Sequence, residues 1–119
     1  MNIDGDIFPI EKVVASSEKD DLAIVKITGD SFHPLPLKSD SPVGSEVTVI
    51  SHPEGRFFTV SKGIISRYYL QRSGKEKGSP RIAITADFAK GSSGSPVFDN
   101  TGSVVGVVAS TNSIYYNRS

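Results

Sequence analysis

The sequence predicts an all-β domain, and three observations support this prediction. Short runs rich in β-branched and aromatic residues recur along the 119 residues, and clusters of glycine, proline, serine and charged residues separate them. No segment of about ten residues repeats its apolar positions at the helical period of 3.6. The spacing of the runs is typical of a barrel or a sandwich.

The first part of the chain is expected to contain two strands and a linker. Residues 7–15 form the first run, and a polar turn is expected at 16–20. Residues 22–27 are apolar almost throughout, which is typical of a strand that is buried on both faces or closes a barrel. Residues 29–43 contain three prolines and are interpreted as a linker between two subdomains.

The remaining part is expected to hold the other strands, at 46–50, 57–66, 82–86, 96–99 and 103–111. Residues 67–70 can prolong the second of these strands, and Gly63 within it is expected to form a β-bulge. A turn is expected at 52–55. The charged, glycine-rich stretch 72–80 is expected to be an exposed hairpin loop.

Composition excludes several classes of function. Thirteen basic and thirteen acidic side chains cancel, so neither nucleic acid nor anionic lipid is an expected partner. There is no cysteine, hence no disulfide or thiolate metal site. No metal-ligand cluster, phosphate loop or nucleotide fingerprint is present, so no metal and no cofactor is expected. Residues 1–6 are acidic and predict no signal peptide, and no apolar run reaches the roughly 20 residues of a membrane span.

The stretch at 86–98 carries the pattern with the clearest chemistry. Ser93 lies between Gly91 and Gly94, and an apolar run follows Pro96. Glycine permits a sharp turn and the close approach of a substrate. The N–H groups of Gly91 and Ser93 would then point to one spot as an oxyanion hole, which acyl transfer requires. The competing interpretation is an ordinary flexible loop of glycine and serine.

A family resemblance favours the first interpretation. The segment Gly91-Ser92-Ser93-Gly94-Ser95-Pro96 resembles the nucleophile motif of trypsin-like (chymotrypsin-fold) serine peptidases. The Val-Phe-Asp that follows is most similar to the bacterial glutamyl-endopeptidase and Htr-type branches. Residues 19–26 resemble the strand entry that carries the family's aspartate, which places that carboxylate at Asp21. Residues 44–55, 63–66 and 102–110 resemble further parts of the second barrel, in the family's order.

The resemblance covers residues 8 to about 113 and implies a trypsin-like antiparallel β-barrel fold. Residues 1–43 would be the last strands of a first barrel with the linker, and residues 44–119 a complete second barrel. The resemblance implies Ser93 as the nucleophile, Asp21 as the carboxylate that orients the base, and a peptide or protein substrate cleaved through an acyl-enzyme.

The base that this mechanism needs is missing from its expected place. In the family the histidine precedes the aspartate, but no histidine precedes Asp21, and both His33 and His52 follow it. Lys90 could suggest a serine–lysine dyad, but a lysine on a polar loop is not desolvated as a base must be. The chain is therefore expected to be a truncated peptidase that is inactive alone, unless another chain supplies the base.

The resemblance also implies a primary substrate pocket. Its base lies six residues before the nucleophile, at Asp87, and the pocket would be lined by Ala109 and Ser110. An acidic base selects arginine or lysine at the cleaved position. Two readings of Asp87 stay open, because Phe88 can block the pocket and Htr-type relatives have a structural aspartate near this point. Ser92 replaces the aspartate that trypsins pair with a freed amino terminus, so that mode of activation is not expected.

A second hypothesis is a non-catalytic β-domain that binds peptides or assembles through open strand edges. An incomplete first barrel would expose apolar residues such as Val25 and Ile27, so residues 22–27 are expected to pack onto the second barrel or a partner. A homodimer or a strand-exchanged oligomer is therefore expected.

Overall fold

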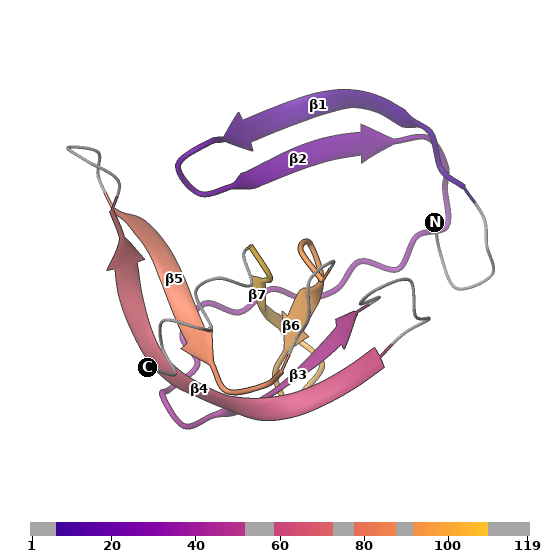
Figure 1. The fold of residues 1–119 in the computed structure, drawn as a ribbon. Coiled ribbons are helices and arrows are strands. Elements are labelled where there is room, and N and C mark those ends of the chain that lie inside the picture. Colours follow the sequence, from indigo (N-terminus) through magenta and orange to yellow (C-terminus); the bar gives the residue numbers. More distant parts are fainter. Residues whose placement is uncertain (1–6, 52–58, 73–77, 88–91, 110–119) are drawn as a thin grey trace. The chain divides into compact units, whose positions relative to one another are not determined.

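A computed structural model describes residues 7–51, 59–72, 78–87 and 92–109, and these residues form strands and no helix. The chain divides into two units, residues 1–34 and residues 35–119. The first unit contains β1 (Ile10–Ser17) and β2 (Leu22–Ile27); the second contains β3 (Glu46–Ser51), β4 (Thr59–Gln71), β5 (Ser79–Ile84), β6 (Pro96–Phe98) and β7 (Val104–Val107) (Figure 1). The all-β prediction is confirmed. Within the described ranges nothing forms a helix of the length and apolar character that crossing a membrane requires.

The first unit is an antiparallel hairpin of β1 and β2. Its turn begins later than the sequence predicts, because β1 continues through Ser17. The Ser17 hydroxyl donates to the Asp20 carboxylate at 2.9 Å and accepts from the Asp20 backbone N–H at 3.2 Å. This pair of hydrogen bonds closes the turn directly after the strand.

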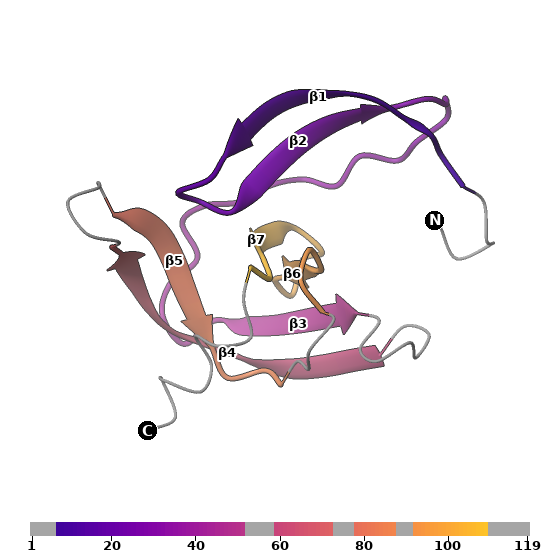
Figure 2. The same cartoon turned by 45° about the horizontal axis from the view of Figure 1, so that its top comes forward.

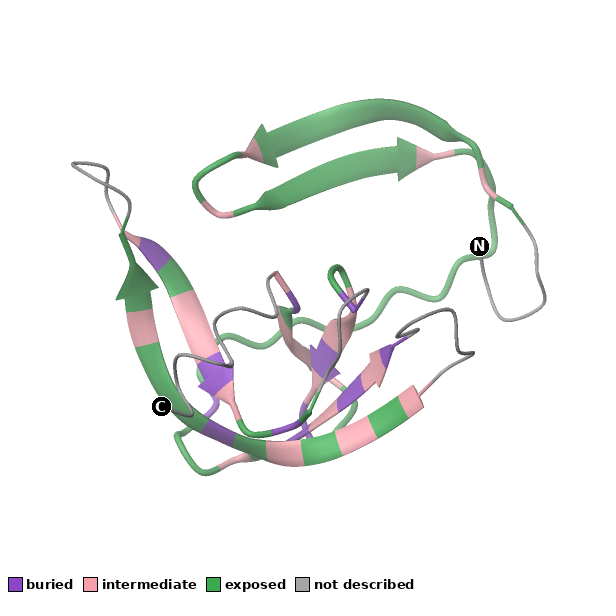
Figure 3. Cartoon of the chain, in the orientation of Figure 1, coloured by how far each residue is buried: buried purple, intermediate pink, exposed green. Residues whose placement is uncertain are grey.

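The hairpin by itself does not bury residues 22–27 on both faces, and their packing onto the second unit or a partner stays a prediction. Every residue of β2 except Ile27 is exposed, and Leu22 and Ile24 keep 49% and 63% of their surface (Figure 3). The pairing with β1 satisfies backbone groups along one edge of β2. Burial of both faces of a two-stranded sheet requires other parts of the protein to cover each face. No described residues of the first unit do so.

The second unit is a five-stranded antiparallel sheet in the order β5-β4-β3-β6-β7. The long strand β4 changes partner along its length: residues 59–64 pair with β3, and residues 65–71 pair with β5. A register shift between Ile65 and Arg67 lies where the partner changes. A bulge at this point bends the strand, and β4 curves around the other strands (Figures 1 and 2).

The sequence placed the bulge of β4 at Gly63, and the structure corrects this. Gly63 pairs regularly with Val47 of β3. Its side of the strand faces the backbone of Thr85 and Ala86, and a Cβ at this position would lie 2.3 Å from the Ala86 nitrogen. The glycine is therefore required by a close approach of two backbone segments.

The core of the second unit lies inside the curved sheet. Its buried residues alternate with less buried ones along β3, as a strand with one inward face requires. They are Val47, Val49, Ile65, Ala86, Val97 and Val108, with Ile84 and Val105 packed against them (Figure 3). The predicted exposed loop at 72–80 ends earlier than expected, because Ser79 is buried and begins β5.

The start of the second unit follows the sheet as an additional extended segment. The backbone N–H of Val104 donates to the Pro36 carbonyl at 2.8 Å, and the N–H of Lys38 donates to the Val104 carbonyl at 2.9 Å. Leu37 thereby forms a parallel bridge with β7. We call residues 35–45 the linker segment. It is attached to the five-stranded sheet by backbone hydrogen bonds at both of its ends, since Ile65 N–H also donates to the Ser45 carbonyl at 3.0 Å.

Candidate functional site

Ser93 lies in a tight turn that backbone hydrogen bonds hold on two sides. Ser95 N–H donates to the Ser92 carbonyl at 3.0 Å, which closes the turn, and Gly94 has the positive φ of 89° that this geometry reserves for glycine. Gly94 N–H donates to the Val108 carbonyl at 2.7 Å, and Val108 N–H donates to the Ser95 carbonyl at 2.9 Å. The turn is thus fastened to the segment that follows β7.

The two adjacent serines of this turn differ in their exposure to solvent. Ser92 is fully buried, whereas Ser93 is exposed. The Ser93 hydroxyl donates to the Ala109 carbonyl over 3.4 Å, a long hydrogen bond. The geometry therefore presents the Ser93 hydroxyl to solvent on a fixed backbone, as a nucleophile requires.

Two of the predicted pocket residues adjoin the same core as the Ser93 turn. Asp87 directly follows the buried Ala86, and Ala109 directly follows the buried Val108. Both of these buried residues belong to the core cluster. The core thus anchors the backbone next to Asp87 and next to Ala109. Asp87 itself is exposed.

Several predicted site residues lie outside the described residues. They include Gly91, which was expected to complete the oxyanion hole, and Ser110 of the expected pocket. Phe88, Lys90 and His52 also lie there, so the blocking of the pocket by Phe88 and the rejection of Lys90 as a base stay predictions.

Asp21 lies in the first unit, at the end of the β1–β2 turn. It is exposed and adopts a φ of 56°, and its backbone N–H donates to the Glu18 carbonyl at 3.2 Å. Asp accepts this left-handed conformation more readily than most residues do. Ser93 belongs to the other unit, so the pairing of the two residues in one triad stays a prediction. His33, also in the first unit, is exposed.

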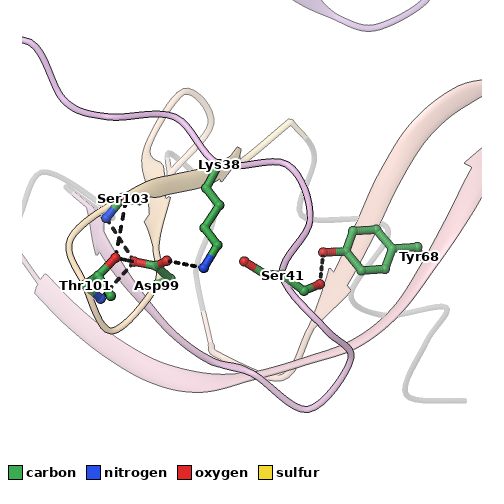
Figure 4. Close-up of polar contacts among 6 residues, drawn as sticks. All are labelled: Lys38, Ser41, Tyr68, Asp99, Thr101 and Ser103. Carbon is green, nitrogen blue, oxygen red and sulfur yellow. Dashed lines mark hydrogen bonds and ion pairs between the residues drawn. The ribbon is translucent and has the colours of Figure 1, made fainter.

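Sequence reasoning missed a buried carboxylate beside β6. Asp99 accepts hydrogen bonds at its Oδ1 atom from the Thr101 hydroxyl at 2.7 Å and from the N–H groups of Thr101 and Ser103 at 2.9 Å each. The other oxygen lies 3.6 Å from the Lys38 ammonium (Figure 4). The spacing of aspartate, threonine and serine after an apolar run is the signal of an Asx turn that could have found it.

These contacts strongly favour the charged form of Asp99. The hydrogen bond from the Thr101 side chain is the largest cause, and the backbone donors and Lys38 act in the same direction against the burial of the group. Together they lower the pKa of Asp99 to about 2. Asp99 is thus a fixed anion that fastens the β6–β7 turn and the linker segment.

The described residues contain no group of three histidine, aspartate or glutamate side chains placed to hold a metal ion. The Ser93 turn offers an exposed hydroxyl on a backbone that hydrogen bonds hold to Val108. An exposed hydroxyl held in this way is one requirement of nucleophilic acyl transfer.

Comparison with known proteins agrees with this geometry. The family model described as "Trypsin-like peptidase domain" matches residues 2–107. The chain is 36% identical over 110 residues to the "Probable periplasmic serine endoprotease DegP-like" of Hahella chejuensis, covering 91% of this chain and 22% of that protein. It is 34% identical over 110 residues to "Anti-sigma-I factor RsgI9" of Acetivibrio thermocellus, covering 89% of this chain and 15% of that protein.

Among solved structures, "Crystal structure of Deg5" matches with a TM-score of 0.66 and 30% identity, covering 84% of this chain and 50% of that one. The fold prediction of a trypsin-like antiparallel β-domain is confirmed by this similarity. The chain spans about half of that structure and about a fifth of the first relative's length.

Proposed function

Since the chain belongs to the family of trypsin-like peptidases, we propose that it carries the nucleophile of a serine endopeptidase that cleaves peptide bonds in peptide or protein substrates. The observation that carries this proposal is the Ser93 turn. It exposes one hydroxyl on a backbone that Val108 holds on two sides.

In the proposed reaction the Ser93 oxygen attacks the carbonyl carbon of the scissile peptide bond and forms a tetrahedral intermediate. The N–H groups of Gly91 and Ser93 stabilise its oxyanion, and one missing donor of this kind costs about 100- to 1000-fold in rate. The C–N bond then breaks, the amine leaves with a proton, and water hydrolyses the acyl-enzyme. Asp21 would orient the group that takes the Ser93 proton and later passes it to the amine.

That group, the general base, has no candidate in this chain at the family's position. No histidine lies among the residues that precede Asp21. We therefore propose that these 119 residues alone do not turn over substrate, and that a histidine from another polypeptide segment completes the site. Loss of the histidine in subtilisin lowers turnover about a million-fold, which is the size of the deficit expected here.

The test is labelling of the full chain by a fluorophosphonate, in which the Ser93 oxygen bonds to phosphorus and fluoride leaves. We expect slow or no labelling of the chain alone, and labelling after addition of a peptide that supplies a histidine-bearing strand. Ser93→Ala should abolish it, while Ser95→Ala, two residues away, should retain it. A chain that stays unlabelled with the added peptide contradicts the enzymatic function.

The exposed apolar hairpin of the first unit favours a second candidate, a module that assembles with another copy of the chain. The residues Ile10, Val13 and Val25 keep 64%, 60% and 42% of their surface. Burying such side chains is worth about 1.5–3 kcal/mol each, which favours a homodimer or a strand-exchanged oligomer. Sedimentation as a monomer at micromolar concentration would contradict this second candidate.

A further inference from the structure

The last half of β4 and the whole of β5 form a two-stranded arm at one edge of the second unit's sheet (Figures 1 and 2). We call residues 65–71 and 79–84 the β4–β5 arm. Ile82 pairs with Tyr68, and its side chain lies against Gly106 of β7 across the curved sheet. Side chains in step with this pair therefore face inward, and those at the alternate positions face the outer side of the arm.

Two arginines flank a tyrosine on the outer side of the β4–β5 arm. Tyr69 pairs directly with Arg81 of β5, and Arg67 precedes Tyr69 by two residues on the same face. The Arg67 guanidinium lies over the Tyr69 ring, 4.8 Å from its centroid. Arg67 and Arg81 are thus diagonal neighbours across the two strands, about 7–8 Å apart.

Both strands of the arm carry positive charge and no negative charge. Neither β4 nor β5 contains an aspartate or a glutamate. The buried Nε atom of Arg81 has no hydrogen-bond partner within the described part of the chain. A buried donor without a partner is unfavourable, and two like charges on one face repel each other. An anionic ligand at the two guanidinium groups relieves both effects.

We propose that the outer side of the β4–β5 arm binds an extended peptide segment of a partner protein that carries two acidic side chains separated by one residue. Alternate side chains of an extended strand point the same way and lie about 7 Å apart. This spacing matches that of Arg67 and Arg81. Each guanidinium can hold one carboxylate through two parallel hydrogen bonds, and Tyr69 lies between the two contacts.

Two further features favour the recognition of peptide side chains on this surface. Pro80 has no N–H group, so it interrupts the addition of a strand along the outer edge of β5. Affinity for nucleic acid rises with the number of phosphates that a protein neutralises. The two arginines of the arm would neutralise only two phosphates, whereas they are sufficient for two carboxylates.

The test measures binding to the full chain and requires no catalysis. The probe is a short fluorescein-labelled peptide in which one valine separates two glutamates, followed by fluorescence anisotropy at about 0.15 M salt. We expect it to bind more tightly than a peptide of the same composition with adjacent glutamates, because adjacent side chains of a strand point to opposite faces. The same peptide with glutamines should show no binding.

Arg67→Gln and Arg81→Gln should each weaken binding about 3- to 10-fold, as expected for a charged hydrogen bond at a partly exposed site. Arg67 is exposed, so its replacement tests the surface even if Arg81→Gln destabilises the arm. The matched control is Lys62→Gln, which removes the same charge from β4 about 17 Å along the strand from Arg67. This distance exceeds the screening length of about 8 Å, so binding should stay unchanged.

The inference is overturned if the peptide with separated glutamates does not bind, or binds no more tightly than the one with adjacent glutamates. Equal losses in Lys62→Gln and Arg67→Gln would also overturn it. Tighter binding of single-stranded oligothymidylate through the same two arginines would assign the surface to nucleic acid and contradict the proposal. None of these results bears on the labelling of Ser93, which tests the peptidase function separately.

Discussion

The ammonium group of Lys38 lies 3.6 Å from the carboxylate of Asp99, and this ion pair joins the linker segment to the turn between β6 and β7 (Figure 4). The Asp99 side chain is 5% exposed and the Lys38 side chain 43% exposed, so the anion is fixed while the cation reaches in from the surface. β6 begins directly after Ser95. Asp99 directly follows the other end of β6, at Phe98. The ion pair therefore holds the end of the strand that begins at the Ser93 turn.

The first prediction concerns pH. The Thr101 hydrogen bond and its partners lower the pKa of Asp99 to about 2 from its usual 3.8. Because the folded-state pKa is the lower one, the ionised group stabilises the fold above about pH 4, and this contribution is lost as the pH falls toward about 2. The free energy of unfolding in urea should therefore fall over that window. Asp99→Asn should make the fall shallower.

The control for this measurement is Asp40→Asn, which removes an exposed carboxylate from the linker segment. Its stability should follow the pH dependence of the unaltered chain. An Asp99→Asn variant that loses stability as steeply as the unaltered chain between about pH 4 and 2 would contradict the assignment.

The second prediction concerns the attachment of the linker segment to β4. The Tyr68 hydroxyl donates to the carbonyl of Ser41, which is 3% exposed (Figure 4). Tyr68→Phe leaves this carbonyl without its donor and should cost about 0.5–1.5 kcal/mol in the free energy of unfolding. Tyr69→Phe is the control, because the Tyr69 ring, over which the Arg67 guanidinium lies at 4.8 Å, is kept. Equal effects of the two variants would count against the Ser41 contact.

The third prediction concerns Gly63. A Cβ at this position would meet the backbone of Ala86 at 2.3 Å, and backbone cannot move aside cheaply. Gly63→Ala should destabilise the second unit by more than the roughly 1 kcal/mol typical of point mutations. Gly106→Ala is the control, because its Cβ would meet only the tip of the Ile82 side chain, at 2.9 Å. Thermal unfolding should rank Gly63→Ala clearly below Gly106→Ala, and the reverse order would refute the close approach.

The fourth prediction compares two neighbouring isoleucines of β4. Ile65 is fully buried, and Ile64 is 42% exposed. Ile65→Ala should cost about 2–5 kcal/mol because it removes buried methyl groups and leaves a cavity. Ile64→Ala should cost clearly less. Urea unfolding of both variants measures the difference, and similar losses would show that the inward face of β4 is assigned wrongly.

Sequence reasoning found most of the strands, because local patterns specify them. The alternation of Val47 and Val49 with less buried neighbours, and the turn residues between 99 and 103, act within a few residues. It failed where the deciding contact lies far away in the chain. The bulge was placed at Gly63 because a glycine inside a strand often marks one, whereas the structure requires the glycine for the passage of Ala86, more than twenty residues later.

The sequence by itself determined the family and the all-β class, because short motifs in order carry that information: Gly91 to Pro96 around Ser93, and the strand entry at Asp21. Only the tertiary structure decided that Ser92 is buried while Ser93 is exposed, and that Asp99 fastens the linker segment. It alone brought Ser61 to the Asp87 carbonyl. These relations depend on contacts between residues that lie 16 to 61 positions apart in the sequence. No local sequence pattern encodes contacts at such separations.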